Sequence, residues 1–347
     1  MSDQGERIVL AARPQGLPKL SDFRHEQFDI PEPGEGEFLA KTLWLSLDPY
    51  MRGRMDDAKS YADPVGIGDP MEGGTVAEIV VSNHPKFAVG DVVESRLGWQ
   101  SHAVSDGTMV RKLDPNVAPV STALGVLGMP GITAYVGLID HGTPKEGETL
   151  VVSAATGAVG SLVGQLGKAR GLRVVGVAGG ADKCAYAVDE LGFDACIDHR
   201  AHDDARSLRK AIIDACPKGV DIYFENVGGK TLEAVVPLMN VHGRIPLCGM
   251  ISWYNSGGLG AGAGEGQNLL PLVWRTILVN RINVRGYIIT DHYDRFPDFV
   301  REVGGLIAEG KVKYRESISD GLATAPQAFI DLLEGRNFGK QLVRVAG

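Results

Sequence analysis

The stretch TLVVSAATGAVGSLVGQLGKAR, residues 149–170, decides how this chain of 347 residues folds. It begins with a continuously apolar run, residues 149–154, which is typical of a parallel strand covered on both faces. A glycine-containing turn over residues 155–160 follows, and residues 161–170 then space their apolar side chains as in a helix. A strand, a glycine turn and a helix in this order predict the beginning of a βαβ unit.

The same alternation continues after residue 170. The pattern predicts strands at 172–179, 195–199, 220–228 and 243–251, with helices at 181–192, 204–219 and 229–240 between them. Strands and helices that alternate at this spacing form a right-handed, parallel α/β sheet with helices on both faces. A doubly wound fold is therefore the expected architecture of this part of the chain.

The flanking sequence has a different texture. Short apolar or alternating runs at 37–47 and 73–82 are separated by turn residues, and the runs at 311–318 and 340–346 look similar. We therefore expect a β-rich domain from residues 1–125 and 311–347, and an α/β domain from residues 126–310. The glycine-rich stretch at 256–266 is either a disordered surface loop or a flap over a cleft, and the sequence does not decide between them.

Composition and charge exclude several classes of protein. The chain has 35 basic and 43 acidic residues, a net charge of −8, and no basic tract, which argues against binding to nucleic acid or an anionic membrane. No run reaches the ~18 apolar residues of a membrane span, and residues 1–16 lack the apolar core of a signal peptide. We expect a soluble, cytoplasmic protein.

The cysteines and histidines predict neither disulfides nor a metal site. Cys184, Cys196, Cys216 and Cys248 form no CxxC pair, and the eight histidines are dispersed. A structural zinc ion needs four closely grouped ligands and a catalytic one needs three. We therefore expect no metal.

The glycine turn predicts a dinucleotide site. Gly157 lets the backbone approach a pyrophosphate, Gly160 permits close packing of the helix on the sheet, and the helix N-terminus offers N–H donors to the phosphates. The second strand then indicates which dinucleotide binds. Where enzymes specific for NAD place an acidic residue, this chain has Val177–Gly180, with Lys183 just beyond. This favours NADP(H), although a lysine here can also be simply a solvated helix residue.

Six motifs carry a family resemblance. They are LSLDPYMRGRM (45–55), GMPGITAY (128–135), AATGAVGSLVGQLGK (154–168), ENVGGK (225–230), GRIPLCGMISWYN (243–255) and GRNFGKQLVRV (335–345). With them the chain resembles the medium-chain dehydrogenase/reductase superfamily, and within it the zinc-independent alkenal double-bond and prostaglandin reductases. It is most similar to the bacterial members that resemble NADPH-dependent curcumin reductase.

The resemblance implies both a fold and an activity. It implies a Rossmann NADP-binding domain and a GroES-like, β-barrel-type substrate domain, assembled as a homodimer. The implied activity is reduction of the C=C bond of α,β-unsaturated aldehydes or ketones, with a hydride from NADPH delivered to the β-carbon. Two alternatives stay open: a zinc-free NADPH quinone reductase, and a nucleotide-binding protein without turnover.

The resemblance also assigns roles to residues. It implies a cofactor site made of Gly157, Ala158, Val159, Gly160, Lys183, His199, Asn226, Cys248, Gly249, Met250, Ile251, Ser252, Tyr254, Ile288, Ile289, Thr290 and Asn337. Tyr50, Met51, Met129 and Thr133 are implied in the substrate site. Tyr254 is the catalytic candidate, either as a proton donor or as an orienting group. His199 stands where many relatives have a tyrosine, which leaves its role open.

Overall fold

The computed structural model describes residues 4–257 and 270–346, which form two compact units. We call residues 129–253 and 270–315 the α/β unit, and residues 4–128, 254–257 and 316–346 the β unit. Each is described by itself. The expected flap at 256–266 lies, from residue 258 onward, outside the described residues.

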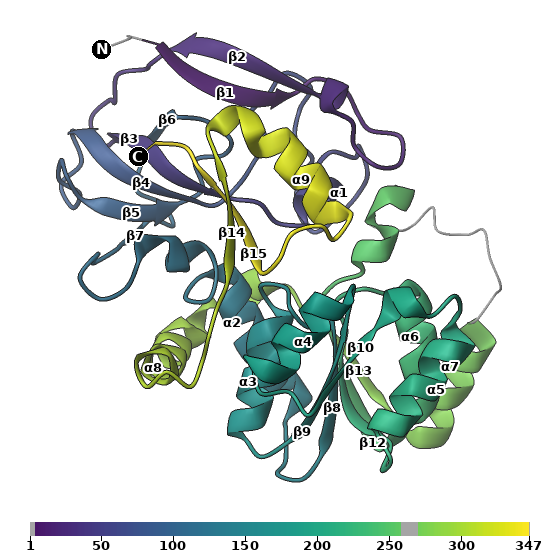
Figure 1. Ribbon diagram of the computed structural model, residues 1–347. Helices are drawn as coiled ribbons and strands as arrows, with labels where there is room; N and C mark the ends of the chain where they lie inside the picture. Colours follow the sequence, from purple (N-terminus) through teal and green to yellow (C-terminus); the bar gives the residue numbers. More distant parts are fainter. Residues whose placement is uncertain (1–3, 258–269, 347) are drawn as a thin grey trace. The chain divides into compact units, whose positions relative to one another are not determined.

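A six-stranded parallel sheet forms the centre of the α/β unit (Figure 1). Its strands are β8 (Thr149–Ser153), β9 (Arg173–Ala178), β10 (Ala195–Asp198), β11 (Val220–Phe224), β12 (Met239–Leu247) and β13 (Asn283–Gly286). The strand order is β10-β9-β8-β11-β12-β13. Because β9 lies on one side of β8 and β11 on the other, the winding reverses at β8, which confirms the doubly wound architecture.

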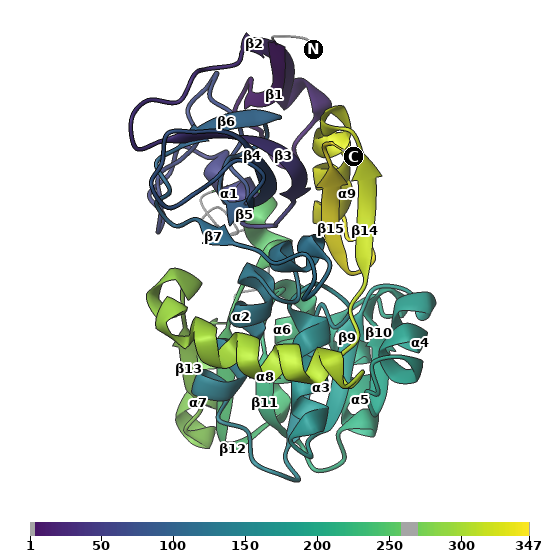
Figure 2. The same ribbon diagram turned by 90° about the vertical axis from the view of Figure 1, so that its left-hand side faces the viewer.

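Helices cover both faces of this sheet (Figures 1 and 2). One face carries α2 (Met129–Val136), α3 (Gly160–Ala169), α4 (Ala181–Asp189) and α8 (Phe296–Ala308), and the other carries α5 (Ala205–Ala215), α6 (Gly229–Val235) and α7 (Leu270–Asn280). Short 3-10 or π turns complete the unit: η3 (Gly137–Gly142), η4 (His199–Ala201), η5 (Val236–Leu238) and η8 (Ile289–Arg295). A further turn, η6 (Ile251–Ser256), follows β12.

Several predicted boundaries differ from the structure by four residues: the strands expected at 220–228 and 243–251 are Val220–Phe224 and Met239–Leu247, and the helix expected at 204–219 ends at Ala215. Two further boundaries are wrong for reasons that the local sequence pattern does not reveal. The helix expected to end at residue 240 stops at Val235, because Pro237 supplies no backbone N–H to continue it, and β12 already begins at Met239. The strand expected from residue 311 begins only at Glu316. The side chain of Gln165 bonds to both the N–H (2.7 Å) and the carbonyl (2.9 Å) of Lys313, so this segment is fixed to α3 instead of a sheet.

The β unit contains a mixed seven-stranded sheet and a separate hairpin. The hairpin pairs β1 (Gln4–Leu10) with β2 (Phe23–Asp29). The sheet consists of β3 (Phe38–Ser46), β4 (Thr75–Ser82), β5 (Val92–Ser95), β6 (His102–Ser105), β7 (Arg111–Lys112), β14 (Glu316–Asp320) and β15 (Lys340–Arg344). The remaining elements are η1 (Leu20–Asp22), α1 (Met51–Arg54), η2 (Val120–Leu124), η9 (Leu322–Thr324) and α9 (Ala325–Leu333). The returning tail joins this sheet through β15, which pairs antiparallel with β3.

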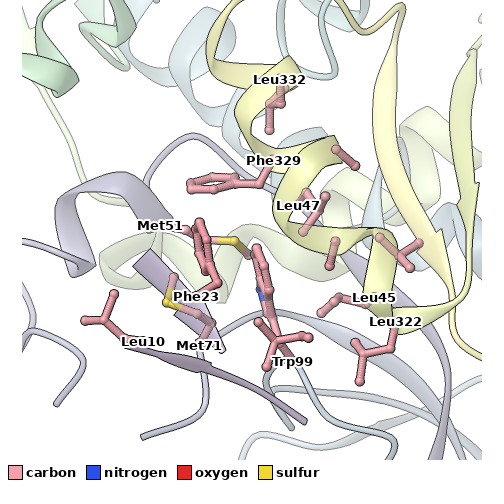
Figure 3. Packing of buried hydrophobic residues seen from close by; sticks show 14 of the residues in the cluster. Leu10, Phe23, Leu45, Leu47, Met51, Met71, Trp99, Leu322, Phe329 and Leu332 are labelled. Carbon is pink, nitrogen blue, oxygen red and sulfur yellow. The ribbon is translucent and has the colours of Figure 1, made fainter. Parts of the chain in front are cut away.

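An aromatic core holds the two parts of the β unit together (Figure 3). The rings of Phe23 and Trp99 stack at a centroid distance of 5.7 Å, and Phe329 from α9 meets Trp99 edge-on, also at 5.7 Å. Burying an aromatic side chain of this kind stabilises a fold by roughly 1.5–3 kcal/mol. Because Phe329 belongs to the tail, the N-terminal residues complete their core only with α9 in place.

In the α/β unit, α3 packs closely against β8 and the segment that leads into β10 because it presents glycines. A Cβ added to Gly164 would lie 1.9 Å from Cζ of Phe193, and one added to Gly167 would lie 2.8 Å from Cδ2 of Leu150. Gly305 on α8 is different, since nothing lies within 4 Å of the position of its Cβ.

These two environments predict opposite effects of alanine. Gly164→Ala should lower the free energy of unfolding by about 1–3 kcal/mol, because Phe193 must move. Gly305→Ala should raise it by up to about 1 kcal/mol, because alanine favours the helix and meets no neighbour. Urea unfolding followed by circular dichroism measures both. Equal stability of the two variants would show that α3 does not need a glycine at this contact.

Candidate functional site

The carboxyl edge of the parallel sheet gathers the predicted cofactor segments of the α/β unit. Each segment lies in the connection or helix start that comes after a strand: residues 157–160 after β8, Lys183 after β9, His199 after β10, Asn226 after β11, residues 248–252 after β12 and residues 288–290 after β13. In parallel sheets of this kind, ligands bind at this edge, beside the strands where the winding reverses. Here those strands are β8 and β11.

The turn after β8 is shaped by contact between backbone atoms. Gly157 N–H donates to the carbonyl of Ala154 at 2.9 Å. A Cβ on Gly160 would lie only 2.3 Å from the same carbonyl oxygen, so the turn requires glycine at this position. Helix α3 begins at Gly160, and the N–H of Ser161 already bonds to the carbonyl of Gly157 at 3.0 Å. The amides of residues 158–160 precede it in the turn, where the sequence analysis expects a pyrophosphate.

A buried carboxylate organises the turn after β11. Glu225 is 1% exposed, and its Oε1 accepts hydrogen bonds from the N–H groups of Val227 (2.6 Å) and Gly228 (3.0 Å) and from the hydroxyl of Ser153 (3.0 Å). Its Oε2 accepts from the hydroxyl of Tyr223 at 2.8 Å. Burial raises the pKa of Glu225 above its ordinary value, while these hydrogen bonds oppose the shift.

Asn226 is held by the neighbouring strand. Its N–H donates to the hydroxyl of Ser153 and its side-chain amide donates to the carbonyl of Ser153, each at 2.8 Å. The residues after β12 then pack on the same turn. Cys248 N–H donates to the carbonyl of Glu225 at 2.9 Å, and Ser252 N–H to that of Val227 at 3.0 Å. The ends of β8, β11 and β12 therefore form one hydrogen-bonded assembly.

Basic side chains cluster where β9 and β10 end. A Cβ added to Gly179 would lie 2.9 Å from Nε2 of His199 and 2.9 Å from Nε of Arg200, so both side chains lie against this backbone. Burial lowers the pKa of Lys183, and the charge of Arg200 lowers it further. Burial also lowers the pKa of His199, with added effects from Lys230 and Arg200. Lys183, which the sequence predicts at a 2′-phosphate, also lowers the pKa of His199 through its charge, and the resemblance leaves the role of His199 open.

Asp198 connects the segment that follows β9 with the segment that follows β10. Its Oδ1 accepts hydrogen bonds from the N–H of Gly180 at 2.8 Å and of Arg200 at 2.9 Å. Burial raises the pKa of Asp198, but these two bonds outweigh it and hold the pKa below its ordinary value. Lys230 supports the same turn by donating to the carbonyl of His199 at 2.8 Å.

Arg200 is a member of the cluster that the sequence analysis missed. The register of the parallel pair places Asp198 beside Ala178, so the residues that follow each strand are neighbours. A basic residue two positions beyond the end of β10 therefore belongs beside Gly179 and Gly180. The rule that a basic residue at the end of the second strand favours a 2′-phosphate, applied also to the neighbouring strand β10, identifies Arg200.

In the β unit, a buried ion pair connects the segments that carry Tyr50 and Asn337. Lys340 Nζ lies 2.6 Å from Oδ1 of Asp48 and donates to the carbonyl of Leu47 at 2.8 Å. Burial lowers the pKa of Lys340, and the charge of Asp48 opposes that shift. The side-chain amide of Asn337 donates to the carbonyl of Gly339 at 2.8 Å. Burial, followed by the charge of Asp48, raises the pKa of Tyr50.

Met51 does not lie where the resemblance implied. It is 0% exposed and packs in the aromatic core, so its side chain has no surface in this structure from which to contact a substrate (Figure 3). Its neighbour Tyr50, which precedes α1, is only partly buried. Adjacent residues of a short helix point in different directions, which explains the difference.

The other implied residues lie near the starts of helices and turns. Met129 and Thr133 form the first turn of α2, where the Thr133 hydroxyl donates to the carbonyl of Met129 at 2.7 Å. The hydroxyl of Tyr287 donates to the carbonyl of Thr133 at 2.9 Å, which fixes α2 beside the end of β13. Ile289 and Thr290 begin η8, with Ile288 directly before it, and Tyr254 lies in η6.

Two absences hold for the part of the chain that the structure describes. Within it, no group of three or more His, Cys, Asp or Glu residues is arranged to hold a metal ion. Among the helices of residues 4–257 and 270–346, none combines the length and the apolar character needed to cross a membrane.

The chain matches two known sequence families. Residues 6–113 match the family described as the N-terminal domain of oxidoreductase, and residues 158–304 match the one described as zinc-binding dehydrogenase. The second description mentions zinc, whereas the described residues of this chain form no metal-binding group.

Curated relatives match over nearly their whole lengths. The chain is 54% identical to an NADPH-dependent curcumin reductase of Escherichia coli, over 99% of this chain and 98% of the relative. It is 40% identical to a 2-alkenal reductase (NADP(+)-dependent) of Nicotiana tabacum, over 98% and 97%. It is 39% identical to prostaglandin reductase 1 of Rattus norvegicus, over 98% and 99%.

A solved structure agrees with these relatives. CurA from Vibrio vulnificus, in complex with NADPH, superposes with a TM-score of 0.93 at 51% identity and covers 99% of both chains. With the fold, the glycine turn and these relatives together, the chain belongs to the medium-chain dehydrogenase/reductase family.

Proposed function

We propose that this protein is an NADPH-dependent reductase of carbon–carbon double bonds conjugated to an aldehyde or ketone. The observation that carries the proposal is the group of basic side chains where β9 and β10 end. His199 and Arg200 lie against Gly179, Lys183 follows in α4, and β9 itself ends without an acidic residue. Relatives named for curcumin and 2-alkenal reduction, at 54% and 40% identity, support the substrate class.

The residues at the carboxyl edge fit the phosphate groups of NADPH. The turn at Gly160 has no room for a Cβ and leads directly into α3, as a pyrophosphate site requires. Lys183 and Arg200 supply positive charge for a 2′-phosphate, and the imidazole of His199 can donate a hydrogen bond to it. An acidic residue at the end of β9 would repel this phosphate, and Val177–Gly180 contain none.

The reaction sets clear tasks for the chain. Bound NADPH supplies a hydride to the β-carbon of the substrate. The protein must then stabilise the enolate oxygen and allow a proton to reach the α-carbon. We assign Tyr254 to the oxygen, as a proton donor or an orienting group, and Asn226 and Asn337 to holding the nicotinamide. Tyr50, Met129 and Thr133 are assigned to the substrate.

Isotope labelling tests the reaction directly. The protein is incubated with a 2-alkenal and NADPH deuterated on either face of C4 in turn. We expect deuterium at the β-carbon of a saturated aldehyde, and deuterium from heavy water at the α-carbon in the complementary experiment. Mass spectrometry and NMR locate the label. Deuterium on the carbonyl carbon, giving an alcohol, would overturn the proposal, and turnover of quinones alone would establish the rival reductase.

Lys183 should decide the choice of cofactor. Lys183→Ala removes a hydrogen bond to a charged group, worth about 1.5–3 kcal/mol, so KM for NADPH should rise roughly 10- to 150-fold. KM for NADH should stay nearly unchanged because NADH has no 2′-phosphate. Lys210→Ala, an exposed lysine on α5, serves as the control and should change neither value. An equal loss with both cofactors would refute the assignment.

Substitution of Tyr254 should separate its two possible roles. Tyr254→Phe should lower kcat for enones while the affinity for NADPH changes little. Loss of a general acid lowers rates by about 10²–10⁴-fold, whereas loss of an orienting group has a smaller effect. A measurable fall of no more than roughly tenfold would therefore make Tyr254 an orienting group, with solvent supplying the proton. Unchanged kcat would remove Tyr254 from the mechanism.

We further propose a homodimer formed through the α/β units. β13 is the last strand of its sheet among the described residues, and its Val284 is 42% exposed. On the adjoining α7, Trp274 and Leu278 are 63% and 77% exposed. An unpaired edge strand beside an exposed apolar helix favours association of two identical edges around a twofold axis.

Sedimentation at micromolar concentration tests this assembly. The protein should sediment at twice the mass of one chain, and Leu278→Lys should shift it toward the monomer by placing a charge in the interface. Ile213→Lys, on the exposed face of α5, is the matched control and should remain dimeric. A wild-type protein that sediments as a monomer would contradict the proposal.

A further inference from the structure

We propose that Cys184 and Cys196 form a reversible disulfide when the protein meets a peroxide, and that this disulfide weakens the binding of NADPH. The two Sγ atoms lie 3.2 Å apart. The inference rests on the proposed function, because it assigns a redox control to the proposed 2′-phosphate site.

The two cysteines belong to the elements that carry the basic cluster. Cys184 lies in the first turn of α4, directly after Lys183, and Cys196 lies in β10, four residues before Arg200. A disulfide has an S–S length of about 2.05 Å, so the sulfur atoms need to approach by only about 1.2 Å. Gly176 on the neighbouring strand leaves room for Cys196, since a Cβ there would lie 3.1 Å from its Sγ.

The environment of the pair favours reaction at Cys184. The thiol of Cys196 donates a hydrogen bond to its sulfur, which lowers the pKa of Cys184, although burial opposes the shift. The same bond and burial raise the pKa of Cys196. Both residues are partly exposed. Burial raises the pKa of Cys216 to about 11 and that of Cys248 to about 12, so the other two cysteines hold their protons.

The oxidation balances with hydrogen peroxide as the oxidant. The Cys184 thiolate attacks one peroxide oxygen, the O–O bond breaks, and the departing hydroxide takes a proton to become water. The resulting sulfenic acid is attacked by the sulfur of Cys196, which forms the S–S bond as the S–O bond breaks and a second water leaves. The two sulfur atoms lose two electrons and the peroxide gains them. A small dithiol reverses the change.

The basic cluster is sensitive to this bond because Asp198 already connects its two sides. The Asp198 carboxylate holds the N–H of Gly180, before α4, and the N–H of Arg200, after β10. Drawing α4 toward β10 changes the separation between Lys183 and Arg200. Ionic hydrogen bonds to phosphate need donor–acceptor distances of about 2.7–2.9 Å, so a displacement of about an ångström weakens a bond made by either side chain.

Peptide mass and cofactor binding, measured on one sample, test the proposal. The tryptic peptide of residues 184–200 contains both cysteines and no other. After peroxide treatment and blocking of free thiols, this peptide should be lighter than the dithiol by two hydrogen atoms and carry no blocking group. The Kd for NADPH, from its fluorescence on binding, should rise roughly three- to tenfold, as expected when one ionic hydrogen bond is weakened. The Kd for NADH should not change, and dithiothreitol should restore both readouts.

Two variants serve as controls. Cys196→Ser should abolish the response to peroxide, whereas Cys216→Ala should keep it. A pair that stays reduced under peroxide, or a disulfide that leaves the Kd for NADPH unchanged, would overturn the inference. Reduced protein that does not bind NADPH at all would instead overturn the proposed function.

Discussion

The hydrogen bonds to the buried carboxylate of Glu225 are the constraint on which the carboxyl edge of the α/β unit depends. One side chain accepts the N–H groups of Val227 and Gly228 and the hydroxyls of Ser153 and Tyr223. Its own backbone carbonyl then accepts the N–H of Cys248. A buried carboxylate is costly without such donors, and each donor is in turn fixed by it. The hydrogen bonds of Glu225 therefore fix the positions of the turns that end β8, β11 and β12 relative to one another.

Much of the α/β unit could be predicted because its signals are local. The apolar run of β8, the turn at Gly160 and the spacing in α3 lie within a few residues of one another, and they predict the elements nearly to their ends. The late start of β14 could not be read in this way. It depends on Gln165, which is 148 positions away from Lys313. A hydrogen bond between residues so far apart cannot be predicted from the spacing of apolar residues.

The candidate site likewise contains residues that local sequence predicts and residues that depend on distant parts of the chain. Lys183 follows from the rule about the second strand, but Arg200 depends on which strand lies beside β9. The strand order fixes that neighbour, and the order emerges only in the folded sheet. Met51 illustrates a second limit, because a sequence motif names adjacent residues without saying which of them faces the core. Similarity to relatives shows that the motif is present. Only the packing shows which of its side chains is buried in the core and which is exposed.

The tail of the β unit has a consequence for how the protein is made. Phe329 and Lys340 close a core and an ion pair whose other partners, Trp99 and Asp48, leave the ribosome much earlier. The α/β unit between them can fold meanwhile, since its sheet uses none of these residues. Until α9 and β15 emerge, the growing chain displays an unfinished apolar surface, which chaperones can hold. A chain cut short before residue 325 would keep that surface and be open to degradation.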